Sequence, residues 1–253
     1  MKDIQFKISE HKLVNADTIK LVLTSDEKLP EITAGQFLNL EVPDHSLILR
    51  RPFCIYDYTD NEVTIYVAVV GKGTLALKNA KKGDYLKASL PLGNGFWQAE
   101  SYQNIGILGG GIGCAPLFRI TKDFKDKNFF AYLGFNTKDR VLFGADFKKT
   151  CKQTIVATTD GTLGEKGYAL DFIKQDIDKL DAIIMCGPHG LVKAAKTALK
   201  DVSIPIFVSL EQRMACGIGA CLVCTCPIIV GDGQKNKRVC MDGPVFNLNE
   251  VVI

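Results

Sequence analysis

The feature that most constrains this 253-residue chain is a group of five cysteines near its C-terminal end. Cys216, Cys221 and Cys224 follow the pattern C-x4-C-x2-C, and fifteen residues separate Cys224 from Cys240. This is the plant-type ligand pattern of a [2Fe–2S] cluster. The fifth, Cys226, lies two residues past Cys224 on an expected strand, so we expect it to face away as a packed thiol.

The residues around the cysteines fit the same interpretation. Three thiolates can converge on one small cluster only if their loop coils tightly, and Gly217 and Gly219 allow the positive φ angles that such a loop needs. Residues 228–230 and 237–239 flank Gly231-Asp232-Gly233, which predicts a hairpin that returns Cys240 to the loop. The alternatives are a zinc site, which usually takes two close cysteine pairs, and ordinary buried thiols.

The rest of the chain has two different patterns. Short runs rich in β-branched and aromatic residues, separated by turn signals, predict an antiparallel β-barrel in residues 1–98. Apolar strands that alternate with amphipathic helices predict a parallel α/β sheet in residues 99–208. Residues 209–253 are too few for a core of their own and need a staple such as a metal. We therefore predict a multidomain chain with these three parts and a hinge at residues 91–96.

The expected elements have these bounds. In the barrel the strands are 5–14, 18–24, 36–42, 62–70 and 85–90, with a helix at 74–79. In the α/β part the strands are 104–108, 129–135, 154–158, 182–186 and 206–210, and the helices are 115–126, 139–149, 168–175 and 190–200.

Two motifs in the barrel part indicate an anion site. The run Arg51-Pro52-Phe53-Cys54 lies on an expected strand, and Gly71 and Gly73-Thr74 come at the start of the short helix. A helix N-terminus preceded by glycines binds anions readily, and an arginine can add a bidentate clamp on a diphosphate. Each signal also fits a surface arginine or a plain turn.

Glycines also mark the edge of the α/β sheet where nucleotides bind. Gly109, Gly110, Gly111 and Gly113 end the first strand of this part and open a helix, with Cys114 where the dinucleotide fingerprint has its third glycine. Two later loops reach the same edge of the sheet: Cys186-Gly187-Pro188, which could close over a nicotinamide, and Asp160-Gly161-Thr162. Tight turns without a ligand are the alternative for each.

Composition excludes several other classes. A hydrophobic content of 47% and a charged content of 23% are those of a soluble globular protein. A net charge of +3 gives no reason to expect a nucleic acid or a membrane as partner. The start of the chain has no apolar signal region, and no run reaches the length of a membrane span, so we expect a cytoplasmic protein. His11, His45 and His189 show no metal-binding or catalytic spacing.

Together these motifs resemble the electron-transfer subunit of the NAD-dependent, two-subunit (class 1B) dihydroorotate dehydrogenases, within the ferredoxin reductase-like superfamily. The resemblance covers the whole chain. It is most specific at residues 211–221 (EQRMACGIGAC) and 238–246 (RVCMDGPVF). Arg51-Pro52, Gly73-Thr74, the glycines of 109–113 and Cys186-Gly187-Pro188 follow in the order of that family.

The resemblance implies FAD on the barrel, NAD(H) as substrate on the α/β part and the [2Fe–2S] cluster on the cysteine loop. The implied FAD contacts are Arg51, Pro52, Phe53, Cys54, Tyr66, Val67, Ala68, Gly73 and Thr74. Hydride would pass between NADH and FAD, and single electrons would cross the cluster to FMN in a catalytic subunit that oxidises dihydroorotate, in a heterotetramer of de novo pyrimidine (UMP) biosynthesis. Hydride transfer needs no acid–base side chain, so we predict no catalytic residue.

The chain departs from the family at Cys54, where Ser is usual, and at Ala68, where Arg is frequent. It also resembles subunits of ferredoxin:NADP oxidoreductases and sulfhydrogenases. Bifurcating reductases among these often replace the first cluster cysteine with an acid, which Cys216 argues against. A zinc-stapled, non-enzymatic binding module is the alternative from another class.

The expected nucleotide is NADH. The superfamily reads the ribose 2′ position with the loops at 136–140 and 159–162. Lys138 and Arg140 could serve a phosphate, but Asp139 and Asp160 would repel one.

Overall fold

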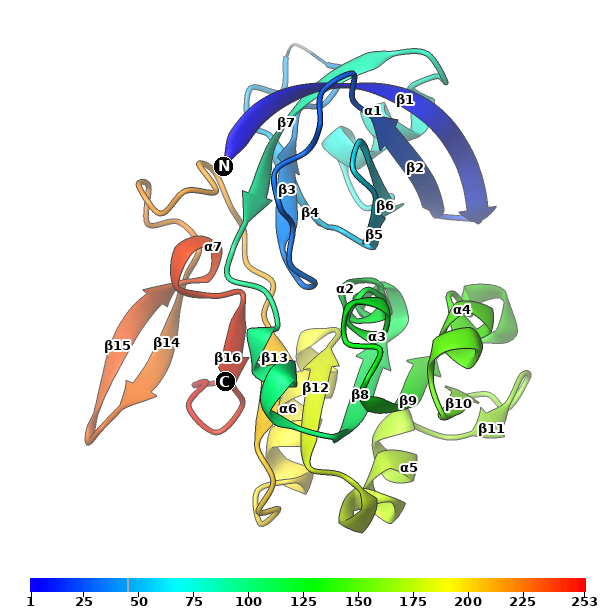
Figure 1. Cartoon of the computed structure of the whole chain (residues 1–253), viewed down its shortest axis with the longest axis vertical. Coiled ribbons are helices and arrows are strands. Elements are labelled where there is room, and N and C mark those ends of the chain that lie inside the picture. Colours follow the sequence, from blue (N-terminus) through cyan, green and yellow to red (C-terminus); the bar gives the residue numbers. More distant parts are fainter. Residues whose placement is uncertain (45) are drawn as a thin grey trace.

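The computed structural model describes residues 1–44 and 46–253, so His45 lies outside the described residues. The chain has three parts that follow one another in sequence. Figure 1 shows the N-terminal barrel above the α/β part, with the C-terminal segment packed beside both. This arrangement agrees with the predicted multidomain architecture, while the domain limits at residues 98 and 208 stay predictions.

The N-terminal part is an antiparallel sheet with the strand order β4-β3-β7-β1-β2-β6-β5. On β1, Ile4, Phe6 and Ile8 are buried and alternate with exposed polar residues, which is the pattern of a strand with one face on a core. The elements are β1 (Lys2–Asn15), β2 (Thr18–Thr24), β3 (Phe37–Leu40), β4 (Arg51–Cys54), β5 (Asp57–Tyr58), β6 (Glu62–Ala68), β7 (Tyr85–Leu92) and helix α1 (Lys72–Asn79).

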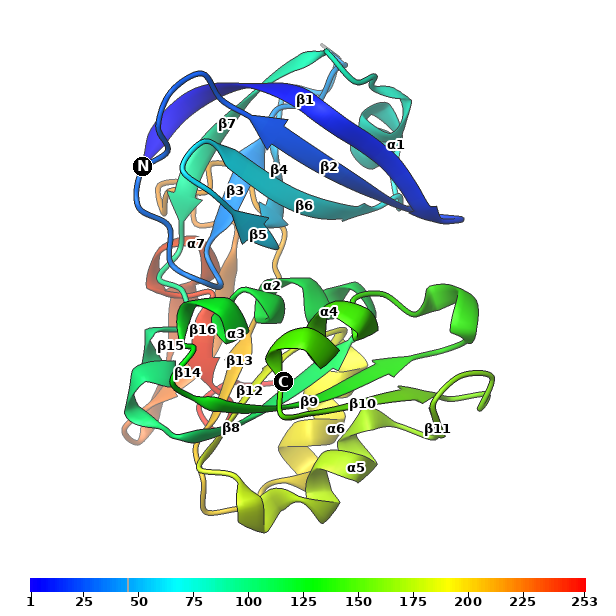
Figure 2. The same cartoon turned by 45° about the vertical axis from the view of Figure 1, so that its right-hand side comes forward.

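The second part is a sheet with the order β11-β10-β9-β8-β12-β13-β16, parallel except for β16. Every residue of β12 is buried, because helices cover both faces. Figure 2 shows α2, α3 and α4 on the side toward the barrel and α5 and α6 on the other. The bounds are β8 (Asn104–Gly110), β9 (Asn128–Phe135), β10 (Gln153–Thr158), β11 (Glu165–Lys166), β12 (Ala182–Cys186), β13 (Ile206–Ser209), α2 (Ala115–Phe118), α3 (Ile120–Asp123), α4 (Gly144–Thr150), α5 (Ala169–Gln175) and α6 (His189–Ala198).

Two predicted helices differ from those observed. The helix expected at 115–126 is divided into α2 and α3. The helix expected at 139–149 begins as the 3-10 turn Lys138–Arg140 and continues as α4 after Phe143, whose φ of 66° interrupts the helical path.

The C-terminal segment contains the predicted hairpin, formed by β14 (Thr225–Val230) and β15 (Gly233–Arg238). It continues with helix α7 (Val239–Asp242) and strand β16 (Val245–Asn247). β16 pairs antiparallel with β13, so the segment adds the last strand of the α/β sheet. The sequence analysis did not predict this strand, because three residues are too few for a periodic signal.

Polar and aromatic contacts join the barrel to the α/β part. Arg119 donates to Asp57 at 2.5 Å and to the Tyr58 carbonyl at 2.7 Å, and its guanidinium lies 3.7 Å from the centre of the Tyr58 ring. Tyr56 stacks on Phe118 and donates to Asp146 at 2.7 Å. These contacts fix the two parts relative to each other. No helix in residues 1–44 and 46–253 is long and apolar enough to cross a membrane.

Candidate functional site

The four predicted cluster ligands come together on one loop and one short helix. Cys216, Cys221 and Cys224 lie on the loop before β14, and Cys240 lies on α7. Backbone amides already point at their sulfurs: Ile218 and Cys221 donate to Cys216 Sγ at 3.4 Å, and Gly219 donates to Cys240 Sγ at 3.1 Å. Such N–H···S contacts are what an anionic iron–sulfur cluster requires.

The loop coils as its glycines predict. Gly217 and Gly219 have φ angles of +72° and +81°, and Leu222 is also left-handed at +59°. Arg238 closes the site from the hairpin side, because it pairs with Asp242 at 3.0 Å and donates to the Gly219 carbonyl at 3.3 Å. The loop is therefore tied to the start of α7 through Arg238.

The thiols of this site differ in acidity. Burial opposes ionisation of Cys216, but the amides of Ile218 and Cys221 outweigh it and lower its pKa to about 6. Burial is the main cause that raises the pKa of Cys240 to about 12, and the neighbouring Cys224 is the second. Cys226 is 3% exposed, and burial raises its pKa to about 11, as expected of a packed thiol.

The described side chains do not form a mononuclear metal site: no three His, Cys, Asp or Glu groups in residues 1–44 and 46–253 converge closely enough to hold one ion. A binuclear cluster divides its four thiolates between two irons. The donor set, the tight loop and the amides aimed at sulfur fit such a cluster.

The predicted flavin residues form a cradle on the barrel. Arg51, on β4, lies over the start of α1: a Cβ built on Gly73 would come within 2.7 Å of its Nε. Thr74 accepts from the Val70 and Gly71 amides at 2.9 and 3.1 Å, which fixes the turn that opens α1. A guanidinium beside free helix-start amides fits a diphosphate.

The other predicted flavin residues have different environments. Tyr66 is half-buried, with its ring edge-on to Tyr56 and Phe143 at 4.8 and 4.6 Å. Val67 is fully buried in the barrel core, so only its backbone can meet a ligand. Ala68 faces a cavity between the barrel and the α/β part.

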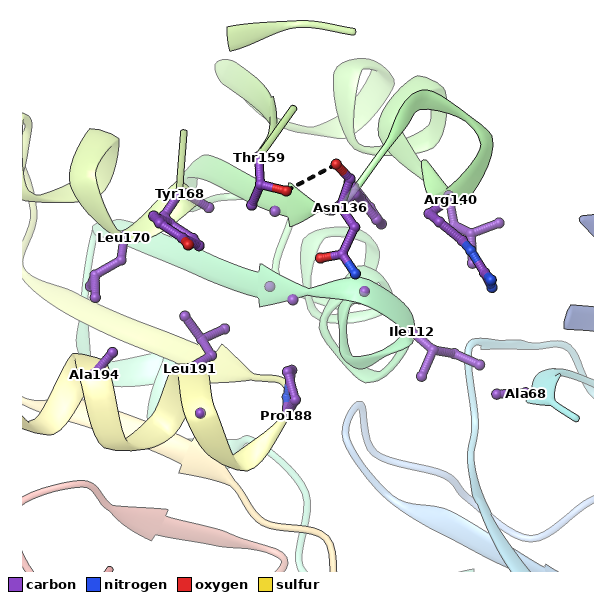
Figure 3. A pocket seen from close by; sticks show the side chains of 18 of the residues that line it. Ala68, Ile112, Asn136, Arg140, Thr159, Tyr168, Leu170, Pro188, Leu191 and Ala194 are labelled. Carbon is purple, nitrogen blue, oxygen red and sulfur yellow. Dashed lines mark hydrogen bonds between the residues drawn. The ribbon is translucent and has the colours of Figure 1, made fainter. Parts of the chain in front are cut away.

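This cavity has a volume of about 620 Å³ and lies at the carboxyl ends of the parallel strands. Figure 3 shows Tyr168 and Leu170 on one side of it, Leu191 and Ala194 opposite, and Ala68 of the barrel at the far end. The end lined by Leu170, Leu191 and Ala194 is apolar and suits an adenine base. The cavity extends from there to Ala68, so a nucleotide bound in it would reach toward the flavin cradle.

Some predicted nucleotide residues line the cavity and others support its wall. Gly109, Gly110, Gly111 and Pro188 line it. Gly113 packs against Gly187, because a Cβ on Gly113 would lie 2.6 Å from the Gly187 Cα. Cys186 and Asp160, like Gly113 and Gly187, are not among the lining residues.

Asp160 is exposed, and its carboxylate accepts from Thr162 Oγ1 at 2.7 Å and from the Thr162 amide at 3.0 Å. These bonds lower its pKa. Thr159, next to it, does line the cavity. Asp160 therefore belongs to the loop at the cavity edge, and its contact with a nucleotide stays a prediction, as do the other individual cofactor contacts.

Residues that the sequence analysis did not assign complete the site. Tyr168, Asp171 and Leu191 line the cavity. Tyr168 precedes α5, and Asp171 and Leu191 lie in the first turns of α5 and α6. Helix starts at this edge of a parallel sheet are where nucleotides bind, so the sequence pattern could have pointed to them.

Glu211 is a further unassigned residue. Part of its surface is exposed to solvent. The pKa of its carboxyl is nevertheless raised, because the neighbouring protein atoms desolvate it. Burial is the main cause that raises the pKa of Cys54 to about 12, and the negative charge of Glu211 is the second. The same two causes, in the same order, raise the pKa of Cys186. Cys54 of β4 and Cys186 of β12 therefore lie near Glu211 and remain neutral thiols.

The comparisons with solved structures define the class of protein. A structure described for flavin-based electron bifurcation by the NADH-dependent reduced ferredoxin–NADP oxidoreductase matches 98% of this chain and 89% of its own, with a TM-score of 0.85 and 28% identity. Phthalate dioxygenase reductase shares the fold with a TM-score of 0.68 at 16% identity, over 93% and 76% of the two chains. The chain is an oxidoreductase of the ferredoxin reductase type.

Curated relatives narrow the class to one family. The electron transfer subunit of dihydroorotate dehydrogenase B (NAD(+)) from Clostridium acetobutylicum is 37% identical over 88% of this chain and 87% of its own. That from Fusobacterium nucleatum is 37% identical over 100% of both. The family model of the iron–sulfur cluster binding domain of dihydroorotate dehydrogenase B matches residues 211–252. This chain belongs to the family of dihydroorotate dehydrogenase B electron transfer subunits, which confirms the predicted resemblance.

Proposed function

We propose that this chain carries electrons between NAD(H) and a catalytic dihydroorotate dehydrogenase subunit, through FAD and a [2Fe–2S] cluster, in pyrimidine biosynthesis. The observation that carries the proposal is the packing of the cysteine loop directly on the flavin-binding barrel. Phe37 and Leu92 of the barrel share one core with Cys224 and Cys240. Cofactors held on these elements would lie close enough for electron transfer without a diffusing carrier.

The chain's own residues have distinct roles in this scheme. Arg51 and the start of α1 bind the flavin diphosphate, and the cavity lined by Gly109, Tyr168 and Leu191 binds NAD(H). Bound FAD supplies the exchange between a hydride and two single electrons. No side chain needs to move a proton for that exchange.

The surface around the cluster loop supports docking of a catalytic partner. Cys221 is exposed, and exposed apolar side chains flank the cluster ligands: Ile218 at 47%, Leu222 at 60%, Val223 at 52% and Met241 at 55%. Apolar residues exposed together mark interaction surfaces. The proposed partner is the FMN-containing catalytic subunit, the proposed assembly a heterotetramer, and the proposed location the cytoplasm.

A ferredoxin:NADP oxidoreductase subunit is the second candidate function. The high structural similarity to such a reductase favours it. The 37% identity to dihydroorotate dehydrogenase B subunits over both full chains favours the first candidate.

The test is reconstitution. The chain is co-purified with a catalytic dihydroorotate dehydrogenase subunit, and dihydroorotate-dependent reduction of NAD⁺ is measured. We expect activity only in the complex, and only NADH oxidation with an artificial acceptor when the chain is alone. A stable complex with no NAD⁺ reduction, together with reduction of ferredoxin, would transfer support to the second candidate.

A further inference from the structure

The walls of the nucleotide cavity carry little positive charge. Among the described residues that line it, Arg140 is the only cation, and it stands beside two carboxylates, Asp17 and Asp171. A dinucleotide carries an anionic diphosphate, which these carboxylates alone would repel. Arg140 is therefore the one lining side chain whose charge favours such a ligand.

Arg140 reaches from the α/β part to the barrel across this cavity. It ends the 3-10 turn after β9, and its Nη1 donates a hydrogen bond to the carboxylate of Asp17, in the turn between β1 and β2. Asp17 is itself fixed to the barrel, because its carbonyl accepts from the Val69 amide at 2.7 Å. The ion pair therefore holds the guanidinium at the point where the two parts meet.

The guanidinium keeps donors for a further anion. Its bond to Asp17 uses Nη1, and Nε and Nη2 have no hydrogen-bond partner among the residues that the structure describes. The planar fork of an arginine matches phosphate oxygens in pairs. Arg140 and Asp17 are 49% and 43% exposed, so an incoming anion can reach these donors while Asp17 stays bound.

Arg140 lies where the middle of a dinucleotide is expected. In Figure 3, Asn136 and Arg140 follow one another along one wall of the cavity, with Arg140 on the side of Ala68. The strand register agrees, because Thr18, which follows Asp17, pairs with Ala68 on β6. An adenine at the apolar end and a nicotinamide toward the flavin cradle leave the diphosphate between them, within reach of this wall.

We propose that Arg140 binds the diphosphate of the dinucleotide and that Asp17 of the barrel is the residue that positions it. Arg140 then serves NADH and NADPH alike, because both carry the diphosphate, and it takes no part in the choice between them. Binding of the nucleotide also depends on the contact between the two parts of the chain. This inference rests on the proposed function, because it requires NAD(H) to bind in this cavity.

The experiment compares Arg140→Met and Arg140→Lys with the native protein, each loaded with FAD, by stopped-flow measurement of flavin bleaching with NADH and with NADPH. Met loses the charge and the donors, whereas Lys keeps the charge and loses the fork. We expect the Kd of both nucleotides to rise at least about tenfold in Arg140→Met, and less in Arg140→Lys, because hydrogen bonds to charged groups contribute that much. The limiting rate of bleaching should not change.

Two controls accompany these variants. Lys138→Met removes an exposed cation of the same 3-10 turn that is not among the residues lining the cavity, so its Kd for NADH should equal the native value. ADP-ribose, which has the diphosphate but no nicotinamide, should lose as much affinity for Arg140→Met as NADH does. The FAD content of both Arg140 variants should equal that of the native protein.

The outcomes separate the possible failures. Native affinity for both nucleotides in Arg140→Met would overturn the inference. A loss for NADPH alone would assign Arg140 to the 2′-phosphate, and loss of FAD with native affinity for NADH would assign it to the flavin; either result would also overturn it. Native protein whose flavin is bleached by neither nucleotide would contradict the proposed function itself.

Discussion

At the scale of single residues, the five clustered cysteines are chemically alike but lie in different surroundings. Cys216, Cys221 and Cys224 lie on one loop and Cys240 on the adjoining α7, with backbone amides pointing at the sulfurs of Cys216 and Cys240, whereas Cys226 is buried on the hairpin. We expect Ser in place of any of the four to remove iron and sulfide, because an alcohol ligates these irons poorly. Cys226→Ser is the matched control and should keep both, as measured by iron and sulfide content and by the visible spectrum.

Full iron retention in one of the four variants, with loss in Cys226→Ser, would contradict this ligand set. The set is predicted from spacing alone, because the expected ligands are close in sequence. Asp17 and Glu211 could not be assigned in the same way. Asp17 meets Arg140 across 123 residues of chain, and no local pattern distinguishes its side chain from any other polar residue in a turn.

At the scale of elements, we expect the loops after β9 and β10 to decide the choice of nucleotide. We expect a higher kcat/KM for NADH than for NADPH with an artificial acceptor, because the carboxylate of Asp160 at the cavity edge repels a 2′-phosphate. Asp160→Ala should narrow the preference, since it removes the carboxylate that opposes the 2′-phosphate. Asp178→Ala, an exposed carboxylate that is not among the residues lining the cavity, is the control.

A native preference for NADPH would contradict the expectation, and an unchanged ratio in Asp160→Ala would place the discriminating group on another residue.

Element positions were largely predictable, because β1, β2 and the parallel strands have strong apolar patterns. The early end of α3 at Asp123 was not. A continuous helical pattern spans residues 115–126, but Phe124 has φ −107° and ψ 64°, so the chain leaves the helix early.

At the scale of the whole molecule, two arginines join the barrel to the α/β part, and they differ in their exposure to solvent. Arg119 is 17% exposed and bonds to Asp57 and Asp123, whereas the pair of Arg140 with Asp17 is 49% and 43% exposed. We expect Arg119→Met to lower the free energy of unfolding by about 2 kcal/mol, since half-buried charged hydrogen bonds contribute that much. Arg140→Met should lower the free energy of unfolding much less, because an exposed ion pair contributes little to stability.

Urea unfolding followed by flavin and tryptophan fluorescence checks both expectations. Equal losses in the two variants would mean that burial of the Arg119 network adds no stability. The contact between the parts could not be predicted from sequence, because nothing near Asp57 in the chain identifies Arg119 as its partner.

The pairing of β16 with β13 has a consequence for biosynthesis. β13 ends at Ser209, but its outer edge stays unpaired until Val245–Asn247 has left the ribosome. Unpaired strand edges invite pairing with other chains. A nascent or truncated chain that ends before the cysteine segment therefore carries an aggregation-prone edge. Loss of the segment in evolution would remove both the proposed cluster ligands and the strand that covers this edge of the sheet.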